Sequence, residues 1–216
     1  MSPSTASPKK TGPGRAAHLG PERRRPLVLD AALEVLLARG YSGTTMTAIA
    51  EAAGVTKPVV YECFDSKDDV LRSLLKREEK RLLDGVEAAL PSELDFSDLP
   101  GLLTASYAAF FAAAADAPDS WRLVFETQRG LPDALAERIR RARTVIVDQI
   151  QQMVRAFVSS RDSSHPERES AVIAEILVSA AESGARVLLS AGTDDDSWTP
   201  DELAAFISSG LLKTWV

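Results

Sequence analysis

The chain is poor in the residues that metal and redox chemistry need, with one cysteine and two histidines among 216 residues. A single cysteine excludes an internal disulfide and a cysteine zinc site, and it fits a reducing cytoplasm. His18 and His165 have no partners at metal-ligand or catalytic-triad spacing. We therefore expect no enzyme, no cofactor and no metal.

Long hydrophobic runs are also missing, since no stretch of about 18 uncharged apolar residues occurs. The first 25 residues carry basic charges with no apolar stretch behind them, so they do not form a secretory signal. We expect a cytoplasmic protein with no membrane partner. The length and an apolar content of 45% allow one small and one larger domain, each with its own core.

Residues 44–67 are the most informative segment, because they predict two short helices separated by a glycine. Thr47 is expected to cap the first helix and Thr56 the second. Gly54 stands where the chain turns, since glycine adopts a left-handed conformation without steric cost. Pro58 falls in the first turn of the second helix, where a missing N–H costs nothing. The pattern is that of a helix-turn-helix that reads DNA, with an ordinary helical hairpin as the alternative.

Charge is distributed unevenly around this motif. Residues 1–77 carry 12 Lys and Arg against 8 Asp and Glu, whereas the other 139 residues carry 13 against 23. The sequence therefore predicts a small, locally basic DNA-reading domain on a larger acidic body.

Several positions in this region resemble the signature of the TetR family of bacterial transcriptional regulators. The resemblance covers about residues 24–75, and these positions carry it: Gly40, Tyr41, Thr44, Thr45, Met46, Ile49, Ala50, Glu51, Ala52, Ala53, Gly54, Val55, Lys57, Tyr61, Phe64, Ser66 and Lys67. The rest of the chain resembles the family in length, helical content and acidity. Cys63 stands where many members carry histidine, and we expect it on the DNA-facing side of the second helix.

The expected fold is all-α, with a three-helix DNA-binding domain over residues 24–72 and a helical effector-binding and dimerisation domain over residues 73–216. Residues 1–23 are predicted to be a disordered basic arm that either contacts DNA or only solubilises the chain. Helices are expected over 26–41, 67–90, 99–115, 133–160, 167–190 and 201–215, with a short one around Trp121. The predicted DNA-binding residues are Arg25, Thr45, Thr47, Thr56, Lys57, Val59, Tyr61 and Lys67.

Aromatic side chains gather in the middle of the chain and indicate either an apolar effector pocket or an ordinary helical core. The predicted ligand-binding residues are Leu103, Tyr107, Phe110, Phe111, Trp121, Phe125, Ile150 and Phe157. A stripe of small and branched residues near the C-terminus predicts a dimer contact, with packing inside one subunit as the alternative. Its members are Ile176, Ala180, Gly184, Val187, Phe206 and Leu211.

The resemblance implies a homodimeric repressor that binds a palindromic DNA operator and is released by a small, largely apolar effector. Two other functions are weighed against it. Cys63 would make the protein a redox-responsive DNA-binding regulator if its oxidation disturbed DNA contact. An enzyme with a helical fold is disfavoured by the isolated histidines.

Overall fold

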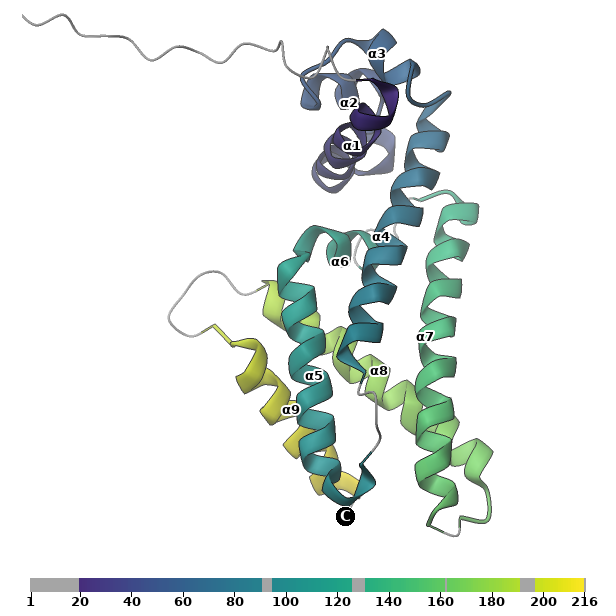
Figure 1. The fold of residues 1–216 in the computed structure, drawn as a ribbon, viewed down its shortest axis with the longest axis vertical. Helices are drawn as coiled ribbons and strands as arrows, with labels where there is room; N and C mark the ends of the chain where they lie inside the picture. Colours follow the sequence, from purple (N-terminus) through teal and green to yellow (C-terminus); the bar gives the residue numbers. More distant parts are fainter. Residues whose placement is uncertain (1–19, 91–94, 126–130, 162, 191–196, 216) are drawn as a thin grey trace, which may run out of the picture. The chain divides into compact units, whose positions relative to one another are not determined.

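The computed structural model describes residues 20–90, 95–125, 131–161, 163–190 and 197–215. Within these ranges all regular elements are helices, which confirms the predicted all-α class (Figure 1). They are α1 (Pro21–Gly43), α2 (Met46–Ala52), α3 (Lys57–Tyr61), α4 (Lys67–Ala89), the 3-10 turn η2 (Phe96–Asp98), α5 (Leu99–Asp116), α6 (Pro118–Phe125), α7 (Asp133–Ser159), α8 (Pro166–Ser190) and α9 (Pro200–Trp215).

The chain divides into two compact units, Met1–Leu74 and Leu75–Val216. We call the first the head and the second the body. No helix in the described part of the chain combines the length and the apolarity that crossing a membrane requires.

The first helix of the head begins five residues earlier than the sequence predicted. Pro21 occupies its first turn, where proline is favoured, and Glu22 places a carboxylate near the positive end of the helix dipole. Tertiary contacts also hold the first turns of α1, since Arg24 pairs with Glu62 and Arg25 donates a hydrogen bond to the Cys63 carbonyl. The prediction of a disordered arm is therefore wrong for residues 21–23, and its remainder up to residue 19 lies outside the described residues.

Helix ends in the body agree closely with the sequence, and local capping groups mark the start of α5 and of α9. Thr199 and Glu202 form a capping box at α9, in which the Thr199 Oγ1 accepts from the Glu202 N–H at 3.3 Å. Within the body α5 packs along α9, and α7 packs along α8 (Figure 1). One core cluster joins α5, α6, α8 and α9 around Phe111, and another joins α4, α7 and α8 around Ile146.

Gly184 permits the close approach of α8 to its neighbours in the body. A Cβ atom there would lie 2.5 Å from Phe111 Cζ and 2.8 Å from Ile207 Cδ1. Only a residue without a side chain fits at this point, and Gly184 is buried inside its own subunit.

Candidate functional site

The first helix of the motif, α2, is capped by Thr45 and not by the predicted Thr47. Thr45 has extended backbone angles, and its Oγ1 accepts from the Ala48 N–H at 3.1 Å. Thr47 already lies within α2, so the prediction that it caps this helix is wrong. Its side chain is exposed, as is that of Thr45.

The turn between α2 and α3 is built as the sequence predicted. Gly54 has a φ of 64°, in the left-handed region that favours glycine. The Val55 N–H then reaches back to the Ala50 carbonyl at 3.0 Å, which closes the end of α2. Thr56 takes the N-cap position of α3, although its hydroxyl makes no capping bond.

The second helix, α3, separates an anchoring side from an exposed side. Val60 is fully buried and fixes α3 to the head. Lys57 and Tyr61 are exposed, with the Lys57 ammonium 5.9 Å from the centroid of the Tyr61 ring. Val59 is half-buried. The exposed side therefore presents a cation, a phenol and the hydroxyl of Thr56.

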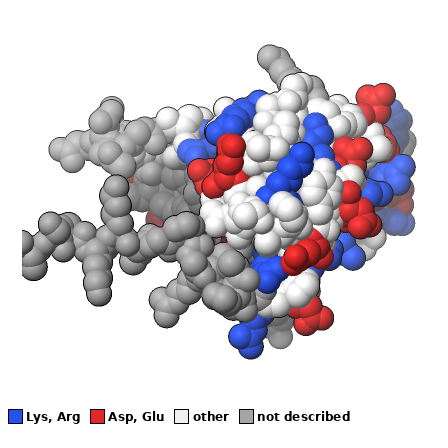
Figure 2. Space-filling view, turned by 90° about the horizontal axis from the view of Figure 1, so that it is seen from above, with Lys and Arg blue, Asp and Glu red and all other residues white. Residues whose placement is uncertain are grey.

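Two other predicted DNA-binding residues hold the head together. The Arg25 Nη1 donates to the Cys63 carbonyl at 2.6 Å, and its guanidinium lies 4.3 Å from the centroid of the Phe64 ring. The Lys67 Nζ donates to the Tyr41 carbonyl at 3.2 Å and lies 3.7 Å from the Tyr41 ring centroid. Figure 2 shows the surface of the molecule seen from above. On the part of that surface that is not grey, positive and negative side chains are interspersed.

Cys63 does not lie on an exposed helix face, so that prediction is wrong. It follows the end of α3 with 4% of its surface exposed, and its Sγ lies 3.8 Å from the Pro21 carbonyl oxygen. Burial raises the pKa of the thiol, and the positive charges of Arg24 and Arg25 offset part of that rise.

The body contains an apolar cavity of about 190 Å³. Six predicted ligand-binding residues line it, namely Leu103, Tyr107, Phe110, Trp121, Ile150 and Phe157. Phe111 is not on its wall but packs in the core beside Gly184. The side chain of Phe125 lies outside the described residues.

Sequence reasoning missed the contribution of α4 to this cavity. Leu82, Val86 and Leu90 line it at a spacing of four residues, which the sequence could have revealed as one apolar face of that helix. It also missed Glu182 on α8, which lines the same wall.

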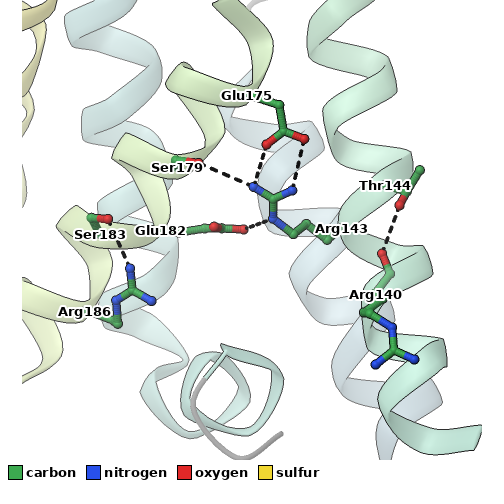
Figure 3. Close-up of polar contacts among 8 residues, drawn as sticks. All are labelled: Arg140, Arg143, Thr144, Glu175, Ser179, Glu182, Ser183 and Arg186. Atoms are coloured by element: carbon green, nitrogen blue, oxygen red, sulfur yellow. Dashed lines mark hydrogen bonds and ion pairs between the residues drawn. The ribbon is translucent and has the colours of Figure 1, made fainter. Parts of the chain in front are cut away.

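An arginine on α7 binds two carboxylates of α8 beside this cavity (Figure 3). The Arg143 Nε donates to Glu182 Oε1 at 2.7 Å, and its Nη2 donates to Glu175 Oε2 at 2.9 Å. Hydrogen bonds to Glu175, and then to Glu182, raise the pKa of the guanidinium against the opposing effect of burial. The guanidinium stays charged, and the cluster of Arg143, Glu175 and Glu182 sets two carboxyl groups against one guanidinium.

The predicted dimer residues differ in their exposure. Ile176, Val187 and Phe206 are large apolar side chains exposed on α8 and α9, with Phe206 64% exposed. Ala180 and Leu211 are half-buried, and Gly184 is buried within the subunit.

The glycine turn, the short exposed α3 and the separate helical body define a helix-turn-helix protein that binds DNA. Residues 28–74 match the family model described as bacterial regulatory proteins, tetR family. Residues 98–209 match the model described as tetracyclin repressor-like, C-terminal domain. The chain belongs to the TetR family of transcription regulators, which are not enzymes.

Similar proteins include the HTH-type transcriptional activator FasR of Mycolicibacterium smegmatis, 32% identical over 82% of this chain and 78% of that protein. The fold is similar to a TetR-like transcriptional regulator from Rhodococcus sp. RHA1, with a TM-score of 0.71, 22% identity, and coverage of 92% of this chain and 98% of that one. It is also similar to the transcriptional regulator FadR from Bacillus subtilis in complex with stearoyl-CoA. There the TM-score is 0.65 at 17% identity, covering 86% of this chain and 96% of that one.

Proposed function

We propose that this regulator is a homodimer that binds a palindromic operator and releases it when an acyl-CoA-type effector occupies the cavity of the body. The observation that carries the proposal is the cavity itself, which is walled by apolar side chains from α4, α5, α7 and α8. Such a space takes the apolar part of a ligand and leaves its polar part outside.

The exposed side of α3 supplies the base-reading and phosphate contacts in this proposal. Lys57 reaches a guanine edge or a phosphate, and Tyr61 donates to a phosphate. Thr56 and Thr45 have exposed positions from which their side chains can approach the DNA backbone. Arg25 and Lys67 contribute mainly by holding α1, α3 and α4 in place.

Two observations support an acyl chain as the buried part of the effector. The wall contains aliphatic and aromatic side chains over several turns of α7, from Ile146 to Phe157. With a rise of about 1.5 Å per residue, those eleven steps span roughly 16 Å, which suits an elongated ligand. A protein of similar fold has stearoyl-CoA bound, which is consistent with this class of effector.

A homodimer is part of the proposal because one recognition helix contacts too few base pairs. Two heads about 34–36 Å apart read two half-sites of a palindrome. Exposed Ile176, Val187 and Phe206 are apolar enough to form the contact between subunits. Ala180 and Leu211 would lie at its edge.

The coupling needs an effector that binds one conformation of the dimer better than the other. In the proposal the occupied cavity favours a dimer whose heads no longer match the operator spacing. Where the bound regulator blocks a promoter, its release from the operator allows transcription. This is the repressor role that the resemblance implies.

The test is fluorescence anisotropy of labelled DNA from upstream of the regulator's own gene. Decanoyl-CoA and stearoyl-CoA are added to the complex, with coenzyme A as the control for charge without a chain. We expect release by at least one acyl-CoA and none by coenzyme A, and loss of the response in a cavity-filling Ile150→Phe variant. Equal release by coenzyme A, or none by either thioester, would contradict the proposed effector.

A further inference from the structure

The wall of the cavity carries few polar side chains, and these differ in the hydrogen bonds that they can offer a ligand. Besides the indole of Trp121, three polar side chains line it: Ser106, Tyr107 and Glu182. The Ser106 hydroxyl donates to the Leu102 carbonyl at 2.9 Å, and the Tyr107 hydroxyl donates to the Leu177 carbonyl at 2.9 Å. Both hydroxyl protons are used within the protein, so these two groups offer a ligand only their oxygen lone pairs.

Glu182 is the strongest acceptor of the three. Its side chain is 15% exposed, and its Oε1 accepts from the Arg143 Nε. Among the described residues no hydrogen bond reaches its other oxygen, Oε2. An ionised carboxylate retains several acceptor sites after one such bond.

Arg143 does not supply a positive site for an anionic ligand. Its Nη1 and Nη2 are both directed at Glu175, at 3.3 and 2.9 Å, and its Nε at Glu182. An acidic ligand that took Arg143 would leave the Glu182 carboxylate unpaired beside apolar side chains, which is costly. A ligand carboxylate near Glu182 would also face two acidic side chains that share one guanidinium.

We propose that Glu182 is a specificity-determining residue of the cavity, and that it accepts a hydrogen bond from a neutral hydroxyl group on the otherwise apolar, buried part of the effector. The inference rests on the proposed use of this cavity as the effector site. It adds to the proposed acyl-chain ligand a preference for chains that carry a hydroxyl over chains that do not.

Two isomeric probes isolate the hydrogen bond from the apolar contact. 1-Octanol and 1-methoxyheptane have the same atoms, but only the alcohol can donate. Their binding to the purified full-length protein is measured by isothermal titration calorimetry without DNA. A hydrogen bond to a charged acceptor favours the alcohol by roughly tenfold or more in Kd.

Matched variants assign the preference to one carboxylate. Glu182→Met keeps the length of the side chain but removes the acceptor, so the preference for the alcohol should disappear. Glu175→Gln changes the other partner of Arg143, which does not line the cavity, and should keep the preference. Octanoate should gain affinity relative to 1-octanol in Glu182→Met, because the opposing charge is gone.

Equal binding of the two isomers to the wild-type protein, binding of neither, or a preference that survives in folded Glu182→Met would overturn the inference. If circular dichroism shows that Glu182→Met does not fold, Glu182→Gln replaces it. The affinity of octanoate relative to that of 1-octanol must then be higher in Glu182→Gln than in the wild type, or the inference is wrong. These results are independent of the operator assay. If acyl-CoA releases the DNA but the protein binds 1-octanol and 1-methoxyheptane equally, only the inference about Glu182 is wrong. If the protein prefers 1-octanol but no acyl-CoA releases the DNA, only the proposed function is wrong.

Discussion

The Ser120 hydroxyl of α6 donates a hydrogen bond to the carboxylate of Glu78 on α4, whose side chain is completely buried. Arg77 and Arg81 bind the same carboxylate, the former through Nε at 2.6 Å. Ser120 directly precedes Trp121 on the wall of the cavity, and Leu82 of that wall follows Glu78 by one turn. The bond therefore ties two walls of the cavity together.

Removal of this bond should destabilise the body. Ser120→Ala leaves a buried acceptor short of one donor, which costs about 1–3 kcal/mol in the free energy of unfolding. Urea denaturation followed by circular dichroism measures the difference. Ser183→Ala is the matched control, since Ser183 lies at the surface of α8 and accepts from Arg186. Equal losses in both variants would mean that the Glu78 contact contributes nothing specific.

A strained backbone position in the head gives a second prediction. Gly40 has a φ of 65° and a ψ of −178°, a region that essentially only glycine enters. No atom lies within 4 Å of the position that a Cβ would take there, so a substitution meets strain but no clash. Gly40→Ala should lower the free energy of unfolding of the head by about 1–3 kcal/mol. Gly20→Ala should cost less, because Gly20 has an ordinary φ of −63° and equally open surroundings and loses only the preference of the N-cap position for glycine.

How far the sequence could predict this molecule depended on whether the information was local. Ser66 and Thr199 cap α4 and α9 through groups three residues away, so those helix ends were visible in the sequence. The sequence could not show whether Thr45 or Thr47 caps α2, because both are threonines and only the backbone angles of Thr45 distinguish them.

The cavity shows the same limit. Phe110 and Phe111 are neighbours on α5, yet one lines the cavity and the other fills the core beside Gly184. That difference depends on where α8 and α9 pack, which spacing along α5 does not reveal. The Arg143–Glu182 pair joins residues 39 positions apart, so no local pattern announced it.

The DNA contact of Lys57 is testable through the salt dependence of binding. If its ammonium neutralises one phosphate, Lys57→Ala should weaken operator binding and reduce the slope of log K against log salt by about one. Anisotropy titrations at several salt concentrations measure both quantities. Lys80→Ala is the control, because Lys80 is an exposed lysine of the body that pairs with Asp84. An unchanged slope in Lys57→Ala would remove Lys57 from the phosphate contacts.

The state of Cys63 bears on the redox alternative. Burial raises the pKa of this thiol, so it stays protonated to higher pH than a free cysteine, and the thiolate is the reactive form. We expect slow labelling by a disulfide reagent in the folded protein at neutral pH, with a rate that rises as the pH passes the raised pKa. Operator binding should survive mild peroxide and should be equal in Cys63→Ser. Rapid neutral labelling, or a loss of binding that a thiol restores, would instead support a redox sensor.

The proposed subunit contact gives the last prediction, and it depends on Phe206. This ring is 64% exposed on α9 and lies 5.2 Å, centroid to centroid, from the ring of Trp198. Phe206→Glu would place a charge in an apolar contact, so the variant should sediment as a monomer at concentrations where the wild type is a dimer. Val145→Glu is the matched control, since Val145 is 47% exposed on α7, a helix that contributes no residue to the proposed contact. Sedimentation velocity separates the monomer from the dimer.

A dimeric Phe206→Glu variant, or dissociation caused equally by Val145→Glu, would place the interface elsewhere on the body. Loss of the dimer should also cost operator affinity, because one head then binds only a half-site.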